Sequence, residues 1–297
     1  MQDIIHDAVL ADRGGSRLHG KAQIVEAVGL EQTCALMPQT RRGGGLIDVV
    51  IDVKNATRAT LRAAGFDIIR YKPHCSPEAA LAKMLRHHRI DILVDVGANE
   101  GQYAQLIRQI GFDGRIISFE PLRVAHQRLE MAASRDPMWN VAPRIALGDQ
   151  EGEVEINVAS NGGASSSILR MLDAHKRAAP EVKYIGSETV SISRLDRVAR
   201  TFLGDDSQKI FLKLDVQGYE MQVLRGSEGL LDRIVGAQLE VSLAPLYEGQ
   251  PLLASVGDYM SSKGFEIWGI VPGFVDDSSG RMLQLDVIFF RTLPQRL

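Results

Sequence analysis

The sequence predicts an α/β fold, in which helices cover both faces of one doubly wound and mostly parallel sheet. The stretch Asp91–Ala104, DILVDVGANEGQYA, has the pattern of a buried strand, a glycine-rich turn and a helix. Further apolar runs then alternate with helical segments, which is typical of parallel sheets. Two late strands, Glu266–Val271 and Leu285–Phe290, are joined by one loop. They would close the sheet with an antiparallel C-terminal strand.

The N-terminal part of the chain is less regular. Ile4–Leu10 and Ala22–Leu30 could be short helices, and Arg41–Gly45 (RRGGG) has the composition of a flexible join. A helix around Ala56–Ala64 and a short strand at Phe66–Tyr71 are expected next. We therefore expect an N-terminal extension over residues 1–60, an arm or small helical segment that could support a homo-oligomer, and one domain over residues 61–297.

A helix start is predicted at Ser76-Pro77-Glu78, because serine caps helices and proline is tolerated at the first helical position. Its apolar face would carry Leu81, Met84, Leu85 and His88. The basic run that ends this helix, Arg86–Arg89 (RHHR), is interpreted as complementing the helix dipole rather than as a site.

The remaining strands divide into two kinds. Continuous apolar runs predict core strands at Arg115–Glu120, Val141–Leu147, Lys209–Asp215 and Val235–Leu243. Alternating patterns predict two strands of antiparallel character beside the main sheet, Glu153–Val158 and Thr189–Arg194. Between these two lie a glycine-serine loop, Asn161–Ser167, and a polar helical stretch around Leu169–Ala178.

Composition excludes several classes of protein. The chain has 297 residues, 45% of them hydrophobic and 24% charged, with a net charge of −3 and a pI near 6.2. This balance argues against a general nucleic-acid binder. Only Cys34 and Cys75 are present, so no disulfide framework or cysteine-rich zinc site is expected. No apolar run is long enough to span a bilayer, and the start of the chain lacks a secretory pattern, so a cytoplasmic protein is expected.

The turn after the first core strand predicts a nucleoside-type cofactor. Gly97, Asn99 and Gly101 allow a tight turn at a helix N-terminus, whose free N–H groups suit a polar ligand. Glu120 ends the next strand, where doubly wound folds hold a ribose. The dinucleotide fingerprint would need glycine at Asn99 and Gln102. The turn resembles instead that of class I S-adenosylmethionine (SAM) methyltransferases.

Four acidic residues are predicted at or just past carboxyl ends of strands: Glu120, Asp149, Asp215 and Glu240. Ligands of open α/β sheets bind at that edge. Asp149 could accept a hydrogen bond from an adenine amino group, or could belong to a plain type I turn. Asp215 could be catalytic, or could only cap the following helix.

The ordered set of motifs from about Leu61 to Arg291 resembles the FkbM family of SAM-dependent methyltransferases. It comprises VDVGANEGQYA (Val94–Ala104), ISFEPL (Ile117–Leu122), ALGDQEGE (Ala146–Glu153), SSSIL (Ser165–Leu169), FLKLDVQGYEMQVLRG (Phe211–Gly226) and QLEVSLAPLYEGQP (Gln238–Pro251). The family often carries glutamate where this chain has Gln217, which shifts attention to Asp215.

The resemblance implies a Rossmann-like methyltransferase domain and O-methylation of a hydroxyl on a small molecule, a sugar or glycolipid, or a polyketide-type product. The implied cofactor residues are Asp95, Gly97, Asn99, Gly101, Glu120, Pro121, Ala146, Asp149 and Asp215.

Methyl transfer to oxygen needs alignment and a base. Asp215 is the first candidate base, Glu240 the second and His175 the third. Alternatively, Asp215 and Glu240 could hold Mg²⁺, and the sequence leaves this open. Tyr247–Pro251 and the region from Trp268 to Arg281 are expected to face substrate, although Trp268 itself is expected in the core. Two alternatives remain: an RNA methyltransferase, which the near-neutral charge disfavours, and a catalytically silent nucleoside-binding scaffold.

Overall fold

The computed structural model describes residues 46–63, 76–204 and 206–292. The chain divides into two compact units, Met1–Lys72 and Pro73–Leu297. The first unit contributes one described helix, α2 (Leu46–Ala63), which includes most of the helix expected at 56–64. The domain boundary expected at 60/61 falls inside this helix. The other expectations for the N-terminal part, at 4–10, 22–30, 41–45 and 66–71, lie outside the described residues.

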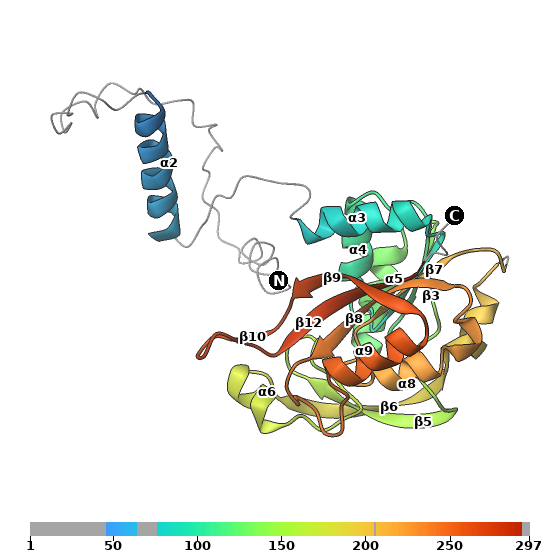
Figure 1. Cartoon of the computed structure of the whole chain (residues 1–297). Helices are drawn as coiled ribbons and strands as arrows, with labels where there is room; N and C mark the ends of the chain where they lie inside the picture. Colours follow the sequence, from blue (N-terminus) through green and yellow to red (C-terminus); the bar gives the residue numbers. More distant parts are fainter. Residues whose placement is uncertain (1–45, 64–75, 205, 293–297) are drawn as a thin grey trace, which may run out of the picture. The chain divides into compact units, whose positions relative to one another are not determined.

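The second unit is built on a seven-stranded sheet (Figure 1), as the sequence predicts. In spatial order its strands are β3 (Trp139–Val141), β2 (Arg115–Phe119), β1 (Ile92–Val96), β7 (Ile210–Leu214), β8 (Ile234–Ser242), β12 (Gln284–Arg291) and β9 (Phe265–Pro272). Neighbouring strands from β3 to β8 are parallel, whereas β12 is antiparallel to both β8 and β9. The predicted mostly parallel sheet with one antiparallel C-terminal strand is confirmed.

Helices cover both faces of this sheet, because its central strands bury side chains on both sides (Figure 1). One apolar cluster joins Leu93 and Phe211 to the helices α3 (Pro77–His88), α4 (Gln102–Gln109) and α5 (Arg123–Ala133). The other joins Val94 and Leu212 to α7 (Leu195–Val198), α8 (Glu220–Arg225) and α9 (Leu253–Ser262). The fold is therefore doubly wound.

Helix α3 begins as predicted, since the Ser76 side chain accepts a hydrogen bond from the Ala79 N–H. In its last turn, His88 lies on the buried face, as predicted, but it does not complement the helix dipole as a cation. The His88 ring is buried and stacks on Phe290 with a centroid distance of 4.0 Å, and burial lowers the pKa of His88 to about 4. His88 is therefore neutral at neutral pH and contributes packing rather than charge. Trp268 of β9 packs beside His88 but is 40% exposed, so it lies only partly in the core, where it was expected.

The segment 141–147, predicted as one core strand, is split between two sheets. β3 ends at Val141 in the main sheet, and β4 (Ala146–Gly148) begins a separate sheet with β6 (Tyr184–Arg194) and β5 (Gly152–Ala159). Pro143 lies between them and has no N–H to donate to a strand ladder. β5 and β6 are antiparallel, as predicted for 153–158 and 189–194.

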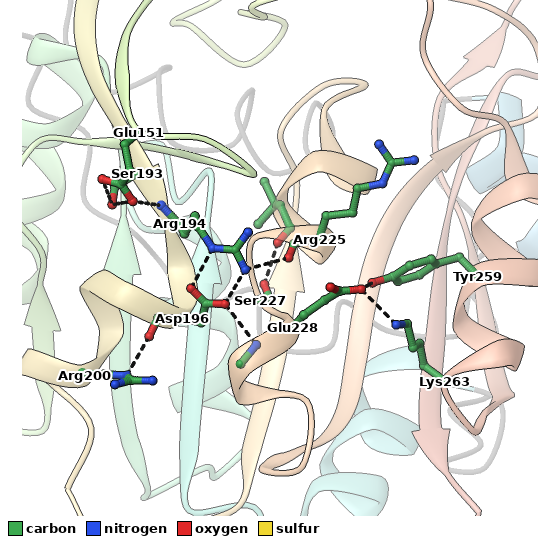
Figure 2. A network of polar contacts seen from close by, with 12 residues as sticks. Glu151, Ser193, Arg194, Asp196, Arg200, Arg225, Ser227, Glu228, Tyr259 and Lys263 are labelled. Atoms are coloured by element: carbon green, nitrogen blue, oxygen red, sulfur yellow. Dashed lines mark hydrogen bonds and ion pairs between the residues drawn. The ribbon is translucent and has the colours of Figure 1, made fainter.

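A polar network ties this second sheet to the main domain (Figure 2). Arg194, at the end of β6, donates to both carboxylate oxygens of Asp196 and to the carbonyl of Arg225 in α8. Asp196 in turn accepts from the N–H of Gly229, in the short 3-10 helix η2 (Glu228–Leu230). Since Glu228 of η2 accepts from Lys263 just after α9, the network reaches from the second sheet to the end of α9.

Shorter elements complete the unit. The helix expected around 169–178 is the single short α6 (Asp173–Ala178), and the 3-10 helix η1 (Ala199–Thr201) follows α7. The loop between β9 and β12 carries a small hairpin of β10 (Val275–Asp276) and β11 (Arg281–Met282). Over the described ranges, no helix has the length and apolar character needed to cross a membrane.

Candidate active site

The turn between β1 and α4 has three residues with positive φ: Gly97 (76°), Asn99 (47°) and Gly101 (91°). A side chain at Gly97 would meet the protein itself, because a Cβ there would lie 1.9 Å from the backbone oxygen of Asp215. A Cβ at Gly101 would lie 2.7 Å from the Trp139 ring. The glycines thus let the turn pack against β7 and β3, a reason that the sequence alone does not give.

Glu120 follows β2 and organises this turn. Its Oε2 accepts the N–H of Asn99 at 2.9 Å, and its Oε1 accepts the N–H of Leu122 at 2.8 Å. The side chain is only 5% exposed, and burial raises the pKa of Glu120 to about 7. A carboxylate has about four lone-pair sites, so acceptor capacity remains for two hydroxyl groups.

The side chain of Asn99 also indicates a ligand at this turn. Its side-chain Oδ1 is buried and has no hydrogen-bond partner among the described residues. Buried polar atoms are normally paired, and an exception calls for an explanation. Together with Glu120, this atom fits a nucleoside cofactor that donates hydrogen bonds at the turn.

The other predicted cofactor residues lie in different surroundings. Asp95 is inside β1 and 1% exposed, and burial raises its pKa to about 7. The carbonyl of Pro121 accepts a hydrogen bond from Arg144, and Ala146 is buried in the cluster that contains Leu122. Asp149 follows β4 of the separate sheet, so the expectation that its strand belongs to the main sheet is wrong. Its Oδ2 lies 4.0 Å from Nη1 of Arg225.

Asp215 and Glu240, at the carboxyl ends of the adjacent strands β7 and β8, are brought together by one side chain. The Gln217 amide donates from Nε2 to Asp215 Oδ1 at 2.8 Å and to Glu240 Oε2 at 2.5 Å. Glu240 also accepts from Gln284 at 3.1 Å. Burial, with the nearby charge of Asp215 adding to it, raises the pKa of Glu240 well above its usual range.

The alternative role of Asp215 as a helix cap is wrong. Helix α8 begins only at Glu220, and its N-cap position is Tyr219, which makes no side-chain cap bond. The N–H groups of Val216 and Gly218 are instead accepted by the Glu220 carboxylate, both at 3.1 Å. Asp215 therefore does not cap helix α8.

A buried lysine lies next to the two acids. The Lys213 ammonium donates to Asp286 at 2.7 Å and lies 3.9 Å from Asp215 Oδ2. Burial works against its charge, but Asp286, Asp215 and Glu240 outweigh burial and raise the pKa of Lys213. The Tyr103 ring lies 5.6 Å from the ammonium. Sequence reasoning missed Lys213 and Asp286, although a charge inside the apolar run Phe211–Leu214 is the signal that could have found the lysine.

The third candidate base, His175, is in α6 and contacts the site through Tyr247. Its ring lies 5.6 Å from that of Tyr247, and burial lowers its pKa. The Tyr247 hydroxyl donates to Gln217 Oε1 at 2.7 Å. Tyr247 therefore lies against the two acids but is fully buried, and the expectation that the segment 247–251 faces substrate stays a prediction. Trp268 packs with His88 and Phe290.

The donor set does not fit Mg²⁺. Within the described ranges no group of three or more His, Cys, Asp or Glu side chains could hold a metal ion. Asp215 and Glu240 instead share the N–H donors of Gln217, beside the Lys213 ammonium. A cation at this place would have to displace the amide hydrogens of Gln217 and would be repelled by the neighbouring Lys213 ammonium.

Two cavities lie apart from these acids. One, of about 310 Å³, is lined by residues between Arg170 and Tyr184. The other, of about 500 Å³, lies near Asp91, Gly114 and Gln208, toward the amino ends of β1, β2 and β7. Ligands of open α/β sheets bind at the carboxyl ends, so the second cavity is at the wrong edge for a cofactor.

The sheet order and the polar turn at its carboxyl edge define an α/β methyltransferase with a Rossmann-like fold. Residues 95–267, more than half of the chain, match the model of the FkbM methyltransferase domain. The chain thus belongs to the FkbM family of SAM-dependent methyltransferases.

The chain is also similar to a curated relative and to solved structures. The 2-O-methyltransferase NoeI of Sinorhizobium fredii is 26% identical over 191 residues, which cover 62% of this chain and 76% of NoeI. Fibrillarin of Aeropyrum pernix, solved with bound SAM, is 12% identical, with a TM-score of 0.38 over 67% of this chain and 66% of its own. An rRNA methylase of Streptococcus thermophilus is 11% identical, with a TM-score of 0.39 over 76% of this chain and 100% of its own.

Proposed function

We propose that this protein is a SAM-dependent O-methyltransferase whose acceptor is a hydroxyl of a small molecule, a sugar or glycolipid, or a polyketide-type product. The observation that carries the proposal is the pair of acids at the ends of β7 and β8, Asp215 and Glu240, directly beside the turn at Gly97. The name of the relative NoeI, a 2-O-methyltransferase, supports oxygen as the acceptor atom.

Cofactor binding is assigned to the polar turn. Glu120 accepts hydrogen bonds from the ribose hydroxyls, and Asn99 Oδ1 accepts from a cofactor donor that satisfies its missing partner. The remaining predicted contacts are Asp95, Gly97, Gly101, Pro121, Ala146, Asp149 and Asp215. When bound, SAM supplies a methyl group on a sulfonium.

Asp215 is proposed as the general base. Its Oδ1 is held by Gln217, while Oδ2 faces Lys213 at 3.9 Å, beyond normal hydrogen-bond length. The carboxylate would take the proton of the acceptor hydroxyl, and bound SAM would supply the methyl group, so that the products would be a methyl ether, S-adenosylhomocysteine and a protonated Asp215. The raised pKa of Glu240 favours its protonated form, so Glu240 is the less suitable base.

The first test is calorimetric binding of SAM, followed by transfer of labelled methyl from SAM to a panel of sugar and polyketide hydroxyls. We expect Asp215→Asn to lower turnover at least about a hundredfold, the low end for general acid–base catalysis, with far smaller change in SAM affinity. Asp258→Asn on the exposed side of α9 is the matched control. Near-normal turnover of Asp215→Asn would contradict the base assignment and favour Glu240. SAM binding without transfer to any acceptor would favour a silent scaffold.

Removal of divalent metal distinguishes the base from a metal site. We expect EDTA to leave turnover unchanged, because the amide hydrogens of Gln217 already pair with both acids and the Lys213 ammonium lies beside Asp215. Loss of turnover in EDTA that Mg²⁺ restores would contradict this expectation.

A further inference from the structure

Gln217, whose side chain joins the two acids, is fixed by hydrogen bonds of both its backbone and its side chain. It lies in the turn between β7 and α8 with a positive φ of 50°, and it is 8% exposed. A non-glycine residue with positive φ is uncommon and indicates that the surroundings fix it. Its backbone carbonyl accepts the Ser167 hydroxyl at 2.7 Å, which ties this turn to the glycine-serine loop at 161–167.

The orientation of the Gln217 amide follows from its partners. Tyr247 donates its hydroxyl hydrogen to Oε1, so the amide nitrogen points to the acids. The nitrogen has two hydrogens, one for Asp215 and one for Glu240. The reversed amide would place its oxygen against two carboxyl groups and would repel any that is ionised.

The charged groups around the pair come from several elements. The two acids interact electrostatically with Lys213 of β7, Asp286 of β12, Asp95 of β1 and Glu220 of α8. The phenol of Tyr103 in α4 lies beside Lys213. Two carboxyl groups this close normally share one proton. A neutral donor between them separates them without adding charge.

From this geometry we propose that Gln217 is a positioning residue: its amide holds the Asp215 carboxylate in one orientation and keeps it from sharing a proton with Glu240. Tyr247 in turn fixes the amide. This inference rests on the proposed function only for its effect on turnover, because the proton arrangement exists in the enzyme without an acceptor.

Two substitutions at Gln217 should differ in how turnover depends on pH. Gln217→Met keeps the length and removes both donors, so turnover should fall at least tenfold at every pH while KM for SAM changes less than about threefold. Gln217→Glu also has the same length, but a protonated carboxyl can donate one hydrogen bond. Its turnover should therefore recover partly as the pH is lowered, which a packing defect would not do. Gln105→Glu, on the exposed face of α4, adds the same charge elsewhere and should behave as wild type.

A measurement without acceptor separates this inference from the proposed function. In protein labelled with ¹³C at Asp and Glu carboxyl carbons, the resonances of Asp215 and Glu240 should titrate about one pH unit or more away from wild type in Gln217→Met. Tyr247→Phe, which keeps the ring against His175, should shift them in the same direction by less. Wild-type titration of both carboxyls in Gln217→Met, in a protein with native circular dichroism, would overturn the inference, whether or not the wild type methylates any acceptor tested. A shift in these titrations with no methyl transfer would overturn the proposed function alone.

Discussion

Among single residues, the buried carboxyl groups decide how the site responds to pH. Asp95, Glu120 and Glu220 each have a pKa raised to about 7, in every case first by burial. Changes of pH around neutrality therefore alter the charge that is buried in this unit. Glu120 is the one whose ionised form is expected to bind the ribose.

SAM affinity should therefore depend on pH through Glu120. Above pH 7 its carboxylate is ionised and accepts two hydroxyl hydrogens; as pH falls below 7 it takes up a proton and loses part of that capacity. We expect wild-type affinity to fall from pH 8 to pH 6. Glu120→Gln should bind about 1.5–3 kcal/mol more weakly at pH 8, as for a hydrogen bond to a charged group, and should show a flatter pH dependence. Calorimetry at several pH values measures this, with Glu153→Gln as an exposed control. Parallel curves for Glu120→Gln and wild type would contradict the assignment.

At the level of elements, the contact between α3 and the β9–β12 hairpin is made by an aromatic cluster around His88. Its ring stacks on Phe290 and meets Trp268 edge-on at 4.6 Å. Neither ring nitrogen has a hydrogen-bond partner among the described residues. A buried imidazole without partners is tolerated only while it is neutral, so this contact is sensitive to acid.

The sign of the effect on stability follows from the lowered pKa. Between about pH 6.5 and pH 4 the unfolded chain binds a proton at His88 that the folded protein does not, so His88 costs stability progressively as the pH falls through that window. The full loss is about 3 kcal/mol at most. His88→Phe should lose less free energy of unfolding between pH 7 and pH 4.5 than wild type in urea titrations. His87→Phe removes a neighbouring charge that helps to lower the pKa of His88, so it should lose less than wild type but more than His88→Phe.

The pattern of neighbouring residues in the sequence predicted most strands and helices of this sheet, but it did not predict contacts between segments that are distant in the sequence. The strand, turn and helix from 91 to 104 could be predicted, because apolar periodicity and glycine are properties of adjacent residues. The split at Pro143 was missed, since an apolar run does not show which of two sheets each end joins. The ion pair of Lys213 with Asp286 depends on the relative placement of β7, β8 and β12, which sequence spacing does not reveal.

At the level of the whole molecule, the unit from Pro73 to Leu297 contains both faces of its own core. All residues assigned to the site lie within it. We therefore propose that this unit is the methyltransferase domain. That the N-terminal extension supports a homo-oligomer stays a prediction from the sequence.

A protein of residues 73–297 should fold and bind SAM within about twofold of the full chain. If the extension supports a homo-oligomer, light scattering should give a smaller assembly for the shortened protein than for the full chain. Loss of SAM binding in a shortened protein with native circular dichroism would show that the site needs residues 1–72. Equal assembly sizes would contradict the role in self-association.

The contact between Gly97 and the Asp215 carbonyl has a consequence for how this enzyme can change. Because a Cβ at Gly97 would lie 1.9 Å from that oxygen, the loop that we propose to bind SAM packs directly against the loop that carries the proposed base. A new acceptor specificity that requires the Asp215 loop to move would also displace the SAM loop. Variants selected for new acceptors should then keep these two positions and accumulate changes elsewhere, such as in the segments around Ser165 and Tyr247. A library that randomises both loops together would yield few folded proteins.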